Sequence, residues 1–343
     1  MTTETIVLNE HRKVTLTAYI QQVGGEFAQV LKRPAVLILP GGAYGMCSDR
    51  EADPVAFAYL KAGYQAFILR YSVADNKTWP NPLDDYEKAI SFIREKSDEW
   101  GVYSDKIAVI GFSAGGHLAA VAATSSKNRP NAAILGYPAL IKETGDMCQK
   151  GMPVPVEQVD DKTCPCFVFA TRNDWVVPVK NTVEFLQALI AKNITFESHI
   201  YSYGNHGYST GEQFLFAGEM CNRAKNWVAD SIEWLKDVFG DFSDGGMTTP
   251  KVQAKMNGNN EEYLSMDCTY GYLKSQSKEV VEILQPLFIP INASLGGAEE
   301  KFAMPLKYVK ACDIATMLLK MPLEKIDELN GKLNKIKNNK GLK

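Results

Sequence analysis

The sequence turns from an apolar strand into a helix within nine residues, VIGFSAGGH at positions 109–117. The run 106–110 that enters this turn is short, continuous and β-branched, which is typical of a buried parallel strand. Gly111 and Gly115 flank Ser113 in the pattern G-x-S-x-G. The pattern predicts a nucleophile elbow, in which small neighbours allow a strained turn to present the serine hydroxyl above the sheet. The alternative is a glycine-rich turn whose serine does no chemistry.

A serine hydroxyl needs a general base and an acid that orients the base. The apolar run 165–171 resembles another buried strand, and Asp174 follows it closely, at the end of the sheet where α/β proteins bind ligands. Asp160 and Asp161 are rivals, but they precede this strand and are expected at its other end. We therefore predict that Asp174 is the acid.

Four histidines could supply the base. His11 lies in the polar N-terminal region, His117 lies on the elbow helix where we expect packing or a hydrogen bond, and His199 lies inside an alternating strand. His206 lies between small residues in the loop after that strand, at the expected end of the sheet. We predict that His206 is the base.

Acyl transfer also needs N–H groups aimed at the developing oxyanion. The residue after the nucleophile, Ala114, supplies one such group in a nucleophile elbow. The loop LPGGAYG at 39–45 follows the apolar strand 35–39, and its small residues allow a substrate oxygen to come near the backbone. Gly42 and Ala43 are the predicted donors in this loop, although Pro-Gly-Gly is also ordinary turn chemistry.

Five separated motifs follow one another along the chain: PGGAY at 40–44, SDREADP at 48–54, GFSAGGH at 111–117, Asn173-Asp174 and NHG at 205–207. This combination resembles the bacterial carbohydrate-esterase branch of the α/β-hydrolases, which includes acetylxylan-esterase-like and feruloyl-esterase-like carboxylesterases. The resemblance runs from about Thr15 to about Leu235 and implies a triad of Ser113, Asp174 and His206. Related enzymes carry His-Gly-Gly-Gly where this chain has Pro40 and Ala43 at the two ends, and the backbone donors survive both changes.

Two residues of these motifs, Tyr44 and Arg50, are candidates for substrate contact. The stretch around Arg50 also has a local explanation, because Ser48 followed by Glu51 is a capping-box pattern at the start of a helix. We expect the stretch to be structural.

The composition describes an enzyme rather than a nucleic-acid binder. The chain has 343 residues, is 45% hydrophobic and carries a net charge of −3, so it can bury a large core and lacks a basic bias. Its seven cysteines are irregularly spaced, and the first ten residues are polar. These features predict a cytoplasmic protein without disulfides. Cys164-Pro165-Cys166 lacks the spacing of a zinc knuckle, no apolar run could span a membrane, and we expect neither a metal nor a cofactor.

Alternating strands and helices predict an α/β-hydrolase fold, with a mostly parallel, doubly wound sheet and antiparallel edge strands between Ile6 and Ile20. We assign residues 1–240 to this catalytic domain, the polar stretch 241–260 to a linker, and residues 261–343 to a small α-helical accessory domain. The weakly periodic segment 141–162 is expected to form a small cap or acyl-pocket loop. The accessory domain could pack, form a homo-oligomer, or dock a partner or a polysaccharide.

These residues predict a serine esterase that acts through an acyl-enzyme on short-chain or aromatic esters. The ester of a small molecule or of an acylated plant oligosaccharide is the expected partner, with no nucleic acid and no membrane. A serine peptidase or amidase on the same fold is an alternative. A binding protein that keeps the scaffold without turnover is a second alternative, although no triad member is missing here.

Overall fold

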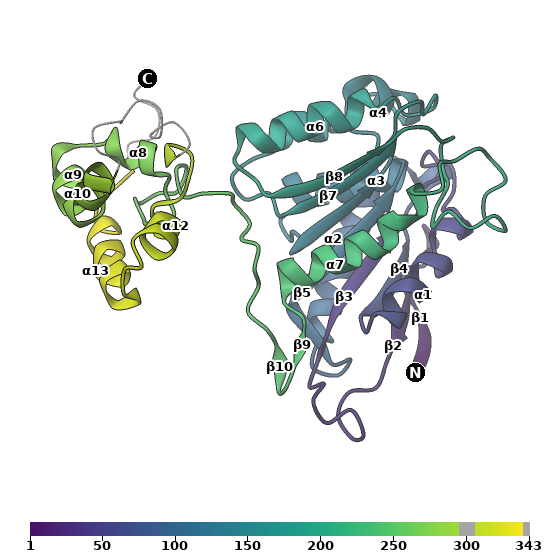
Figure 1. Ribbon diagram of the computed structural model, residues 1–343. Helices are drawn as coiled ribbons and strands as arrows, with labels where there is room; N and C mark the ends of the chain where they lie inside the picture. The colour runs from purple at the N-terminus through teal and green to yellow at the C-terminus, as the bar shows by residue number, and fades with distance from the viewer. Residues whose placement is uncertain (295–305, 339–343) are drawn as a thin grey trace. The chain divides into compact units, whose positions relative to one another are not determined.

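The computed structural model describes residues 1–294 and 306–338, with the side chains of 292–294 left aside. The chain divides into two compact units, Met1–Ala254 and Lys255–Lys343. The first unit contains the strands of the large sheet, and the second is mainly helical (Figure 1).

An eight-stranded sheet forms the centre of the first unit, in the order β1-β2-β4-β3-β5-β6-β7-β8. The first two strands run antiparallel to their neighbours, and β3 to β8 pair in parallel, as the sequence predicted. The strands are β1 (Thr2–Asn9), β2 (Val14–Ile20), β3 (Arg33–Leu39), β4 (Gln65–Arg70), β5 (Val102–Phe112), β6 (Ala132–Gly136), β7 (Cys166–Thr171) and β8 (Phe196–Tyr201).

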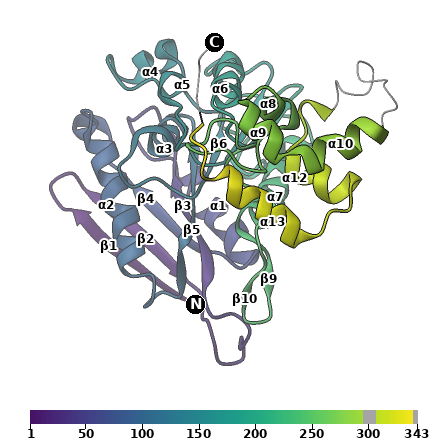
Figure 2. The ribbon, with the colours of Figure 1, turned by 90° about the vertical axis from the view of Figure 1, so that its left-hand side faces the viewer.

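Helices cover both faces of the sheet (Figures 1 and 2). Their bounds are α1 (Asp53–Lys61), α2 (Asn81–Glu95), α3 (Ala114–Ser125), α4 (Lys142–Cys148), α5 (Pro155–Gln158), α6 (Lys180–Ala191) and α7 (Trp227–Phe239), with short 3-10 helices η1 (Asp49–Glu51), η2 (Ala74–Asn76) and η3 (Ala224–Asn226). Buried residues of α2, α3 and α6 share one core with the sheet, and those of α1 and α7 share another.

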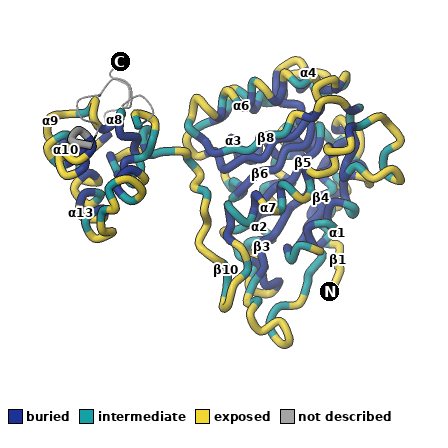
Figure 3. The backbone as a smooth tube through the Cα atoms, in the orientation of Figure 1, coloured by how far each residue is buried: buried dark blue, intermediate teal, exposed yellow. Residues whose placement is uncertain are grey.

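Alternation along each strand explains the two cores. In β3, for example, Val36 and Ile38 belong to the core under α1 and α7, whereas Leu37 and Leu39 belong to the core under α2 and α3. The central strands are therefore buried on both faces, as the dark blue strands of Figure 3 show. Their carboxyl ends carry the loops that form the candidate site.

The boundary between the units differs from the predicted linker at 241–260. Residues 242–247 form a small hairpin, β9 (Phe242–Ser243) with β10 (Gly246–Met247). The Thr195 N–H then donates to the Ala254 carbonyl at 3.0 Å, which ties this stretch to the start of β8. Polar composition suggested a linker, but backbone hydrogen bonds hold residues 241–254 in the first unit.

The second unit has a core of its own, in which Leu264, Leu273, Leu287, Ile314 and Leu329 are buried. Its elements are α8 (Tyr270–Lys274), α9 (Lys278–Ile283), α10 (Gln285–Ser294), α12 (Ala311–Asp313), the π-helix η4 (Ile314–Leu318) and α13 (Leu323–Leu333). This agrees with the helical pattern of the sequence, while 295–305 and 339–343 of the predicted accessory domain lie outside the described residues. Within the described ranges, no helix has the length and hydropathy needed to cross a membrane.

Candidate active site

Ser113 lies at the junction of β5 and α3, in the predicted elbow. Its backbone has φ 52° and ψ −116°, a strained conformation for a residue with a side chain. A Cβ atom at Gly111 would lie 2.2 Å from the Gly115 carbonyl oxygen, and one at Gly115 would lie 2.1 Å from the Leu39 carbonyl oxygen. Only glycine at these two positions allows the strand, the turn and the neighbouring strand end to approach so closely.

Two hydrogen bonds join the three predicted triad residues. His206 Nε2 lies 2.8 Å from Ser113 Oγ, and His206 Nδ1 lies 2.6 Å from Asp174 Oδ2. The other oxygen of Asp174 accepts the backbone N–H groups of Val176 and Val177 at 2.8 and 2.9 Å, which fixes the carboxylate after β7. The structure thus brings together residues from three separate loops in the arrangement of a nucleophile, a base and an orienting acid.

The three other histidines lie apart from this arrangement. The His117 ring is buried, with Nδ1 2.8 Å from the Tyr44 hydroxyl and Nε2 2.8 Å from the Pro153 carbonyl oxygen. Burial lowers the pKa of His117 to about 4. His199 contacts Glu197 on β8, and His11 is exposed. The buried, hydrogen-bonded ring of His117 agrees with the packing or hydrogen bond expected for it.

The rival acid Asp160 has a structural partner of its own. Its two carboxylate oxygens accept hydrogen bonds from Arg129 at 2.6 and 2.8 Å. The bond to Arg129 is the largest cause that lowers the pKa of Asp160 to about 2. Asp160 precedes β7 and Asp174 follows it, so the two carboxylates lie at opposite ends of that strand.

The predicted oxyanion donors lie in strained or terminal backbone. Gly42, Ala43 and Tyr44 have φ values of 128°, 53° and 57°, and the N–H groups of Gly45 and Met46 both donate to the Gly42 carbonyl. Ala114 is the first residue of α3, where an N–H has no acceptor within the helix. Among the described residues, no hydrogen bond occupies the N–H of Gly42, Ala43 or Ala114, so these groups are available to a substrate oxygen.

The two candidates for substrate contact have different surroundings. Tyr44 is only 1% exposed, and its hydroxyl is engaged by His117, so its side chain belongs to the core rather than to a substrate surface. The prediction for Tyr44 was therefore wrong, because the pattern of a loop does not reveal which side chains turn inward. Arg50 is exposed, and a Cβ atom at Gly207 would lie 3.8 Å from Arg50 Nη2, which places the guanidinium beside the His206 loop.

Residues 48–53 do not form the expected capping box. Ser48 precedes η1 without a side-chain capping bond, and α1 begins only at Asp53. The Ser48 N–H, which a capping glutamate would accept, donates to the Gly41 carbonyl at 2.9 Å. The Glu51 carboxylate instead accepts the Gly41 N–H and the Tyr137 hydroxyl, two groups near the predicted site.

Sequence reasoning missed Glu51 and Tyr137 as parts of the site. The capping-box pattern with Ser48 already offered a local role for Glu51, and its partner Tyr137 is 86 positions away in the chain. The available signal was Gly136-Tyr137-Pro138, which follows the apolar run of β6 at the same end of the sheet as Ser113 and Asp174. A tyrosine there is placed by topology beside the neighbouring strand ends.

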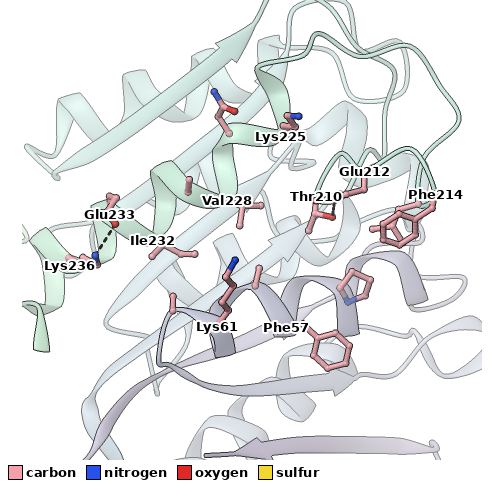
Figure 4. Close-up of a pocket in the computed structure, with 16 residues that line it drawn as sticks. Phe57, Lys61, Thr210, Glu212, Phe214, Lys225, Val228, Ile232, Glu233 and Lys236 are labelled. Atoms are coloured by element: carbon pink, nitrogen blue, oxygen red, sulfur yellow. Dashed lines mark hydrogen bonds and ion pairs between the residues drawn. The ribbon is translucent and has the colours of Figure 1, made fainter. Parts of the chain in front are cut away.

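An open groove, drawn in Figure 4, has a lining that contains no triad residue. It has a volume of about 830 Å³ and runs between α1 and α7, with Phe57, Phe214 and Ile232 among its lining residues. None of Ser113, Asp174 and His206 lines it. The described part of the chain also contains no group of three or more histidine, cysteine, aspartate or glutamate side chains placed to hold a metal ion.

Comparison with known proteins places this geometry in a family context. A family model described as BD-FAE matches residues 28–134. An endo-1,4-beta-xylanase B of Butyrivibrio fibrisolvens is 30% identical over 55% of this chain and 34% of its own length. An acetylxylan esterase of Xylanibacter ruminicola is 26% identical over 57% of this chain and 45% of its own length. The chain thus spans less than half the length of these two curated relatives.

This chain matches two solved structures over most of their own length. An acetyl ester-xyloside bifunctional hydrolase from Caldicellulosiruptor lactoaceticus is 27% identical, with a TM-score of 0.58 over 66% of this chain and 89% of its own. MGS-M1, an alpha/beta hydrolase enzyme from a Medee basin deep-sea metagenome library, is 44% identical, with a TM-score of 0.65 over 69% of this chain and 98% of its own. With this relative matched over nearly its full length and the elbow and sheet in place, the chain belongs to the α/β-hydrolase family.

Proposed function

We propose that the protein is a serine hydrolase of carboxylic esters. The observation that carries this proposal is the continuous contact from Ser113 Oγ through the His206 ring to Asp174, at 2.8 and 2.6 Å. The carboxylate of Asp174 can only accept, so His206 carries its hydrogen on Nδ1 and leaves Nε2 free to take the serine proton. That tautomer is the one that activates a serine hydroxyl.

The geometry suits a reaction in two halves. Ser113 Oγ attacks the ester carbonyl while His206 Nε2 takes its proton, and the carbonyl oxygen becomes an oxyanion facing the N–H groups of Gly42, Ala43 and Ala114. His206 then returns the proton to the departing alkoxide, which leaves an acyl group on Ser113. Water attacks this acyl-enzyme with His206 again as base, and the carboxylic acid is released.

We further propose that the substrates are acetyl or aromatic esters carried by plant-derived oligosaccharides. Support comes from the names of relatives, which include an acetylxylan esterase, a xylanase and an acetyl ester-xyloside hydrolase. The Arg50 guanidinium beside Gly207 offers a hydrogen-bond donor to a sugar hydroxyl or an acyl oxygen at the edge of the site.

Hydrolysis by the full chain should be measured on p-nitrophenyl esters of increasing acyl length, acetylated xylooligosaccharides and methyl ferulate. We expect turnover that favours the short esters and falls by at least about 10³-fold in Ser113→Ala, because the nucleophile is gone. Turnover retained by Ser113→Ala would contradict the proposal. Turnover of p-nitrophenyl acetate without release of acetate from the oligosaccharides would overturn the substrate class alone.

We also propose that the protein works in a reducing compartment. Seven unpaired cysteines suit a reducing compartment such as the cytoplasm. A homo-oligomer formed through residues 261–343 stays a prediction, which the molar mass of the full chain in solution would test.

A further inference from the structure

A buried carboxylate lies behind the oxyanion loop, and the reaction proposed above assigns it no role. Glu51 is 3% exposed. Its Oε2 accepts the Gly41 N–H at 2.8 Å, and its Oε1 accepts the Tyr137 hydroxyl at 2.6 Å. A buried carboxylate is costly unless hydrogen-bond donors or opposite charges compensate it, and both oxygens of Glu51 have a donor.

The first tie holds the oxyanion loop against the nucleophile. A Cβ atom at Gly41 would lie 2.7 Å from Glu51 Oε2, 2.8 Å from the Phe112 carbonyl oxygen and 3.1 Å from Ser113 Cβ. The Gly41 backbone is therefore clamped between the carboxylate and the elbow. Gly42 and Ala43 follow directly in the chain, so the position of the Gly41 N–H determines where their own N–H groups begin.

The second tie reaches the loop of the base. The Tyr137 hydroxyl accepts the Ser209 N–H at 3.0 Å while it donates to Glu51. Ser209 lies three residues after His206, and its carbonyl accepts the Trp227 indole N–H at 2.8 Å. The Tyr137 ring also packs edge to face against the His206 ring, with centroids 4.9 Å apart. Tyr137 thus links Glu51 to both the backbone and the side chain of the catalytic-base loop.

The direction of these hydrogen bonds requires an ionised carboxylate. The Ser209 N–H donates to the Tyr137 hydroxyl, and the Tyr137 hydroxyl and the Gly41 N–H each donate to one oxygen of Glu51. A protonated Glu51 would leave one of these hydrogens without an acceptor. Burial is the largest influence and raises the pKa of Glu51, whereas the bonds from Tyr137 and Gly41 and the charges of His206 and Arg50 lower it.

We propose that Glu51 is a positioning residue of the esterase reaction: it fixes the oxyanion loop through Gly41 and the His206 loop through Tyr137, and its negative charge favours the imidazolium that His206 becomes in the transition state. This inference rests on the proposed function. The charged and titratable groups around His206 include Asp174 from the loop after β7, Tyr137 from the end of β6 and Glu51 from η1, and Arg50 lies beside the neighbouring Gly207.

Two variants separate the two parts of the proposal. Glu51→Gln removes the charge and replaces one acceptor by a donor, whereas Tyr137→Phe keeps the charge and the ring contact but breaks the link to Ser209. A matched control is Glu87→Gln on α2, because Glu87 also accepts two hydrogen bonds, from Ser126 Oγ and the Lys127 N–H, outside the site. Rates on p-nitrophenyl acetate are normalised to the fraction of protein that a fluorophosphonate probe labels.

For Glu51→Gln we expect kcat to fall by about 10- to 100-fold, with KM changed by less than about threefold, because misplaced donors act on the transition state. The acidic limb of the pH profile of kcat/KM should move to lower pH, because a negative charge that favours protonated His206 is lost. Tyr137→Phe should lower kcat by about tenfold and leave the acidic limb in place. Glu87→Gln should match the wild type in both.

A lower melting temperature with wild-type kcat and an unmoved acidic limb in both site variants would overturn the proposal, because Glu51 would then only stabilise the fold. If Glu51→Gln does not fold, Tyr137→Phe decides: wild-type kcat overturns the link to the His206 loop, and a reduced kcat supports it. If the wild type shows no Ser113-dependent turnover, it is the proposed function that has failed.

Discussion

Among individual residues, Asp174 is the most buried member of the triad, and His206 and Ser113 are partly exposed. The side chain of Asp174 is 1% exposed, that of His206 is 14% exposed, and Ser113 is half-buried. Asp174, the proposed acid, is shielded from water, which strengthens its interaction with the ring, while Ser113, the proposed nucleophile, stays partly exposed. Asp174 and Ser113 each contact the His206 ring, and Ser113 remains accessible to a substrate.

His199 on β8 and His206 in the loop after it offer a direct comparison of two histidines. We expect His206→Ala to lower kcat/KM by at least about 10³-fold, because the serine proton then has no acceptor. His199→Ala removes a contact with Glu197 and should change kcat/KM by less than about threefold, as surface changes away from a site generally do. Steady-state kinetics on p-nitrophenyl acetate measure both, and the reverse ranking would refute the assignment of the base.

His117 should make the first unit less stable in mild acid. Its pKa is lowered from 6.5 to about 4 by burial, so below pH 6.5 the unfolded chain binds a proton that the fold resists. Stability therefore falls as the pH drops from 6.5 towards 4, by about 2 kcal/mol between pH 7 and pH 5.

Urea unfolding followed by tryptophan fluorescence checks this, because all five tryptophans lie in residues 1–254. His117→Gln has no ionisable ring and should lose about 2 kcal/mol less than the wild type between the two pH values. An identical loss in both proteins would show that His117 does not resist protonation.

At the scale of the element, the elbow was predictable because its information is local. Strand β5, the flanking glycines and α3 follow one another without interruption, and each obeys its own pattern. Glu51 was not predictable in this way, because the capping pattern with Ser48 competes with tertiary partners that only the assembled sheet supplies. The prediction for Tyr44 was wrong for the same reason, because its hydroxyl contacts His117 on α3, a distant part of the chain.

The elbow glycines yield a prediction with an internal control. Gly115→Ala places a methyl group 2.1 Å from the Leu39 carbonyl oxygen, so we expect a loss of at least about 3 kcal/mol and weak fluorophosphonate labelling of Ser113. Gly145→Ala in α4 meets no atom within 4 Å and should be neutral or stabilising by about 0.5–1 kcal/mol. Urea midpoints compare the two, and equal effects would mean that elbow contacts impose no special constraint.

At the scale of the whole molecule, the sequence predicted two parts but misplaced the boundary between them. The polar composition of residues 241–260 predicted a linker, because composition does not show which backbone groups form hydrogen bonds. The Val252 and Lys251 N–H groups donate to the Asp237 carbonyl, and Thr195 Oγ1 donates to the Gln253 carbonyl. These partners come from α7 and from Thr195 just before β8, so no local pattern could reveal them.

The boundary can be tested by two truncations. We expect residues 1–254 to hydrolyse p-nitrophenyl acetate with kcat/KM within about twofold of the full chain, because the site and both cores of the sheet are retained. Residues 1–240 lose at least four backbone-acceptor hydrogen bonds, to Asp237, Gln253 and Ala254, and should be less stable by about 2–4 kcal/mol. Equal stability of the two fragments would restore the predicted boundary.

In the proposed reaction an acyl group is carried on Ser113. The most direct test of this step is to mix the full chain with p-nitrophenyl acetate, quench in acid within the first turnover, and locate the added acetyl group by peptide mass spectrometry. We expect acetyl on Ser113 in the wild type and none there in His206→Ala. Turnover without acetyl on Ser113, or acetyl on another nucleophile whose replacement stops turnover, would show that Ser113 is not the nucleophile.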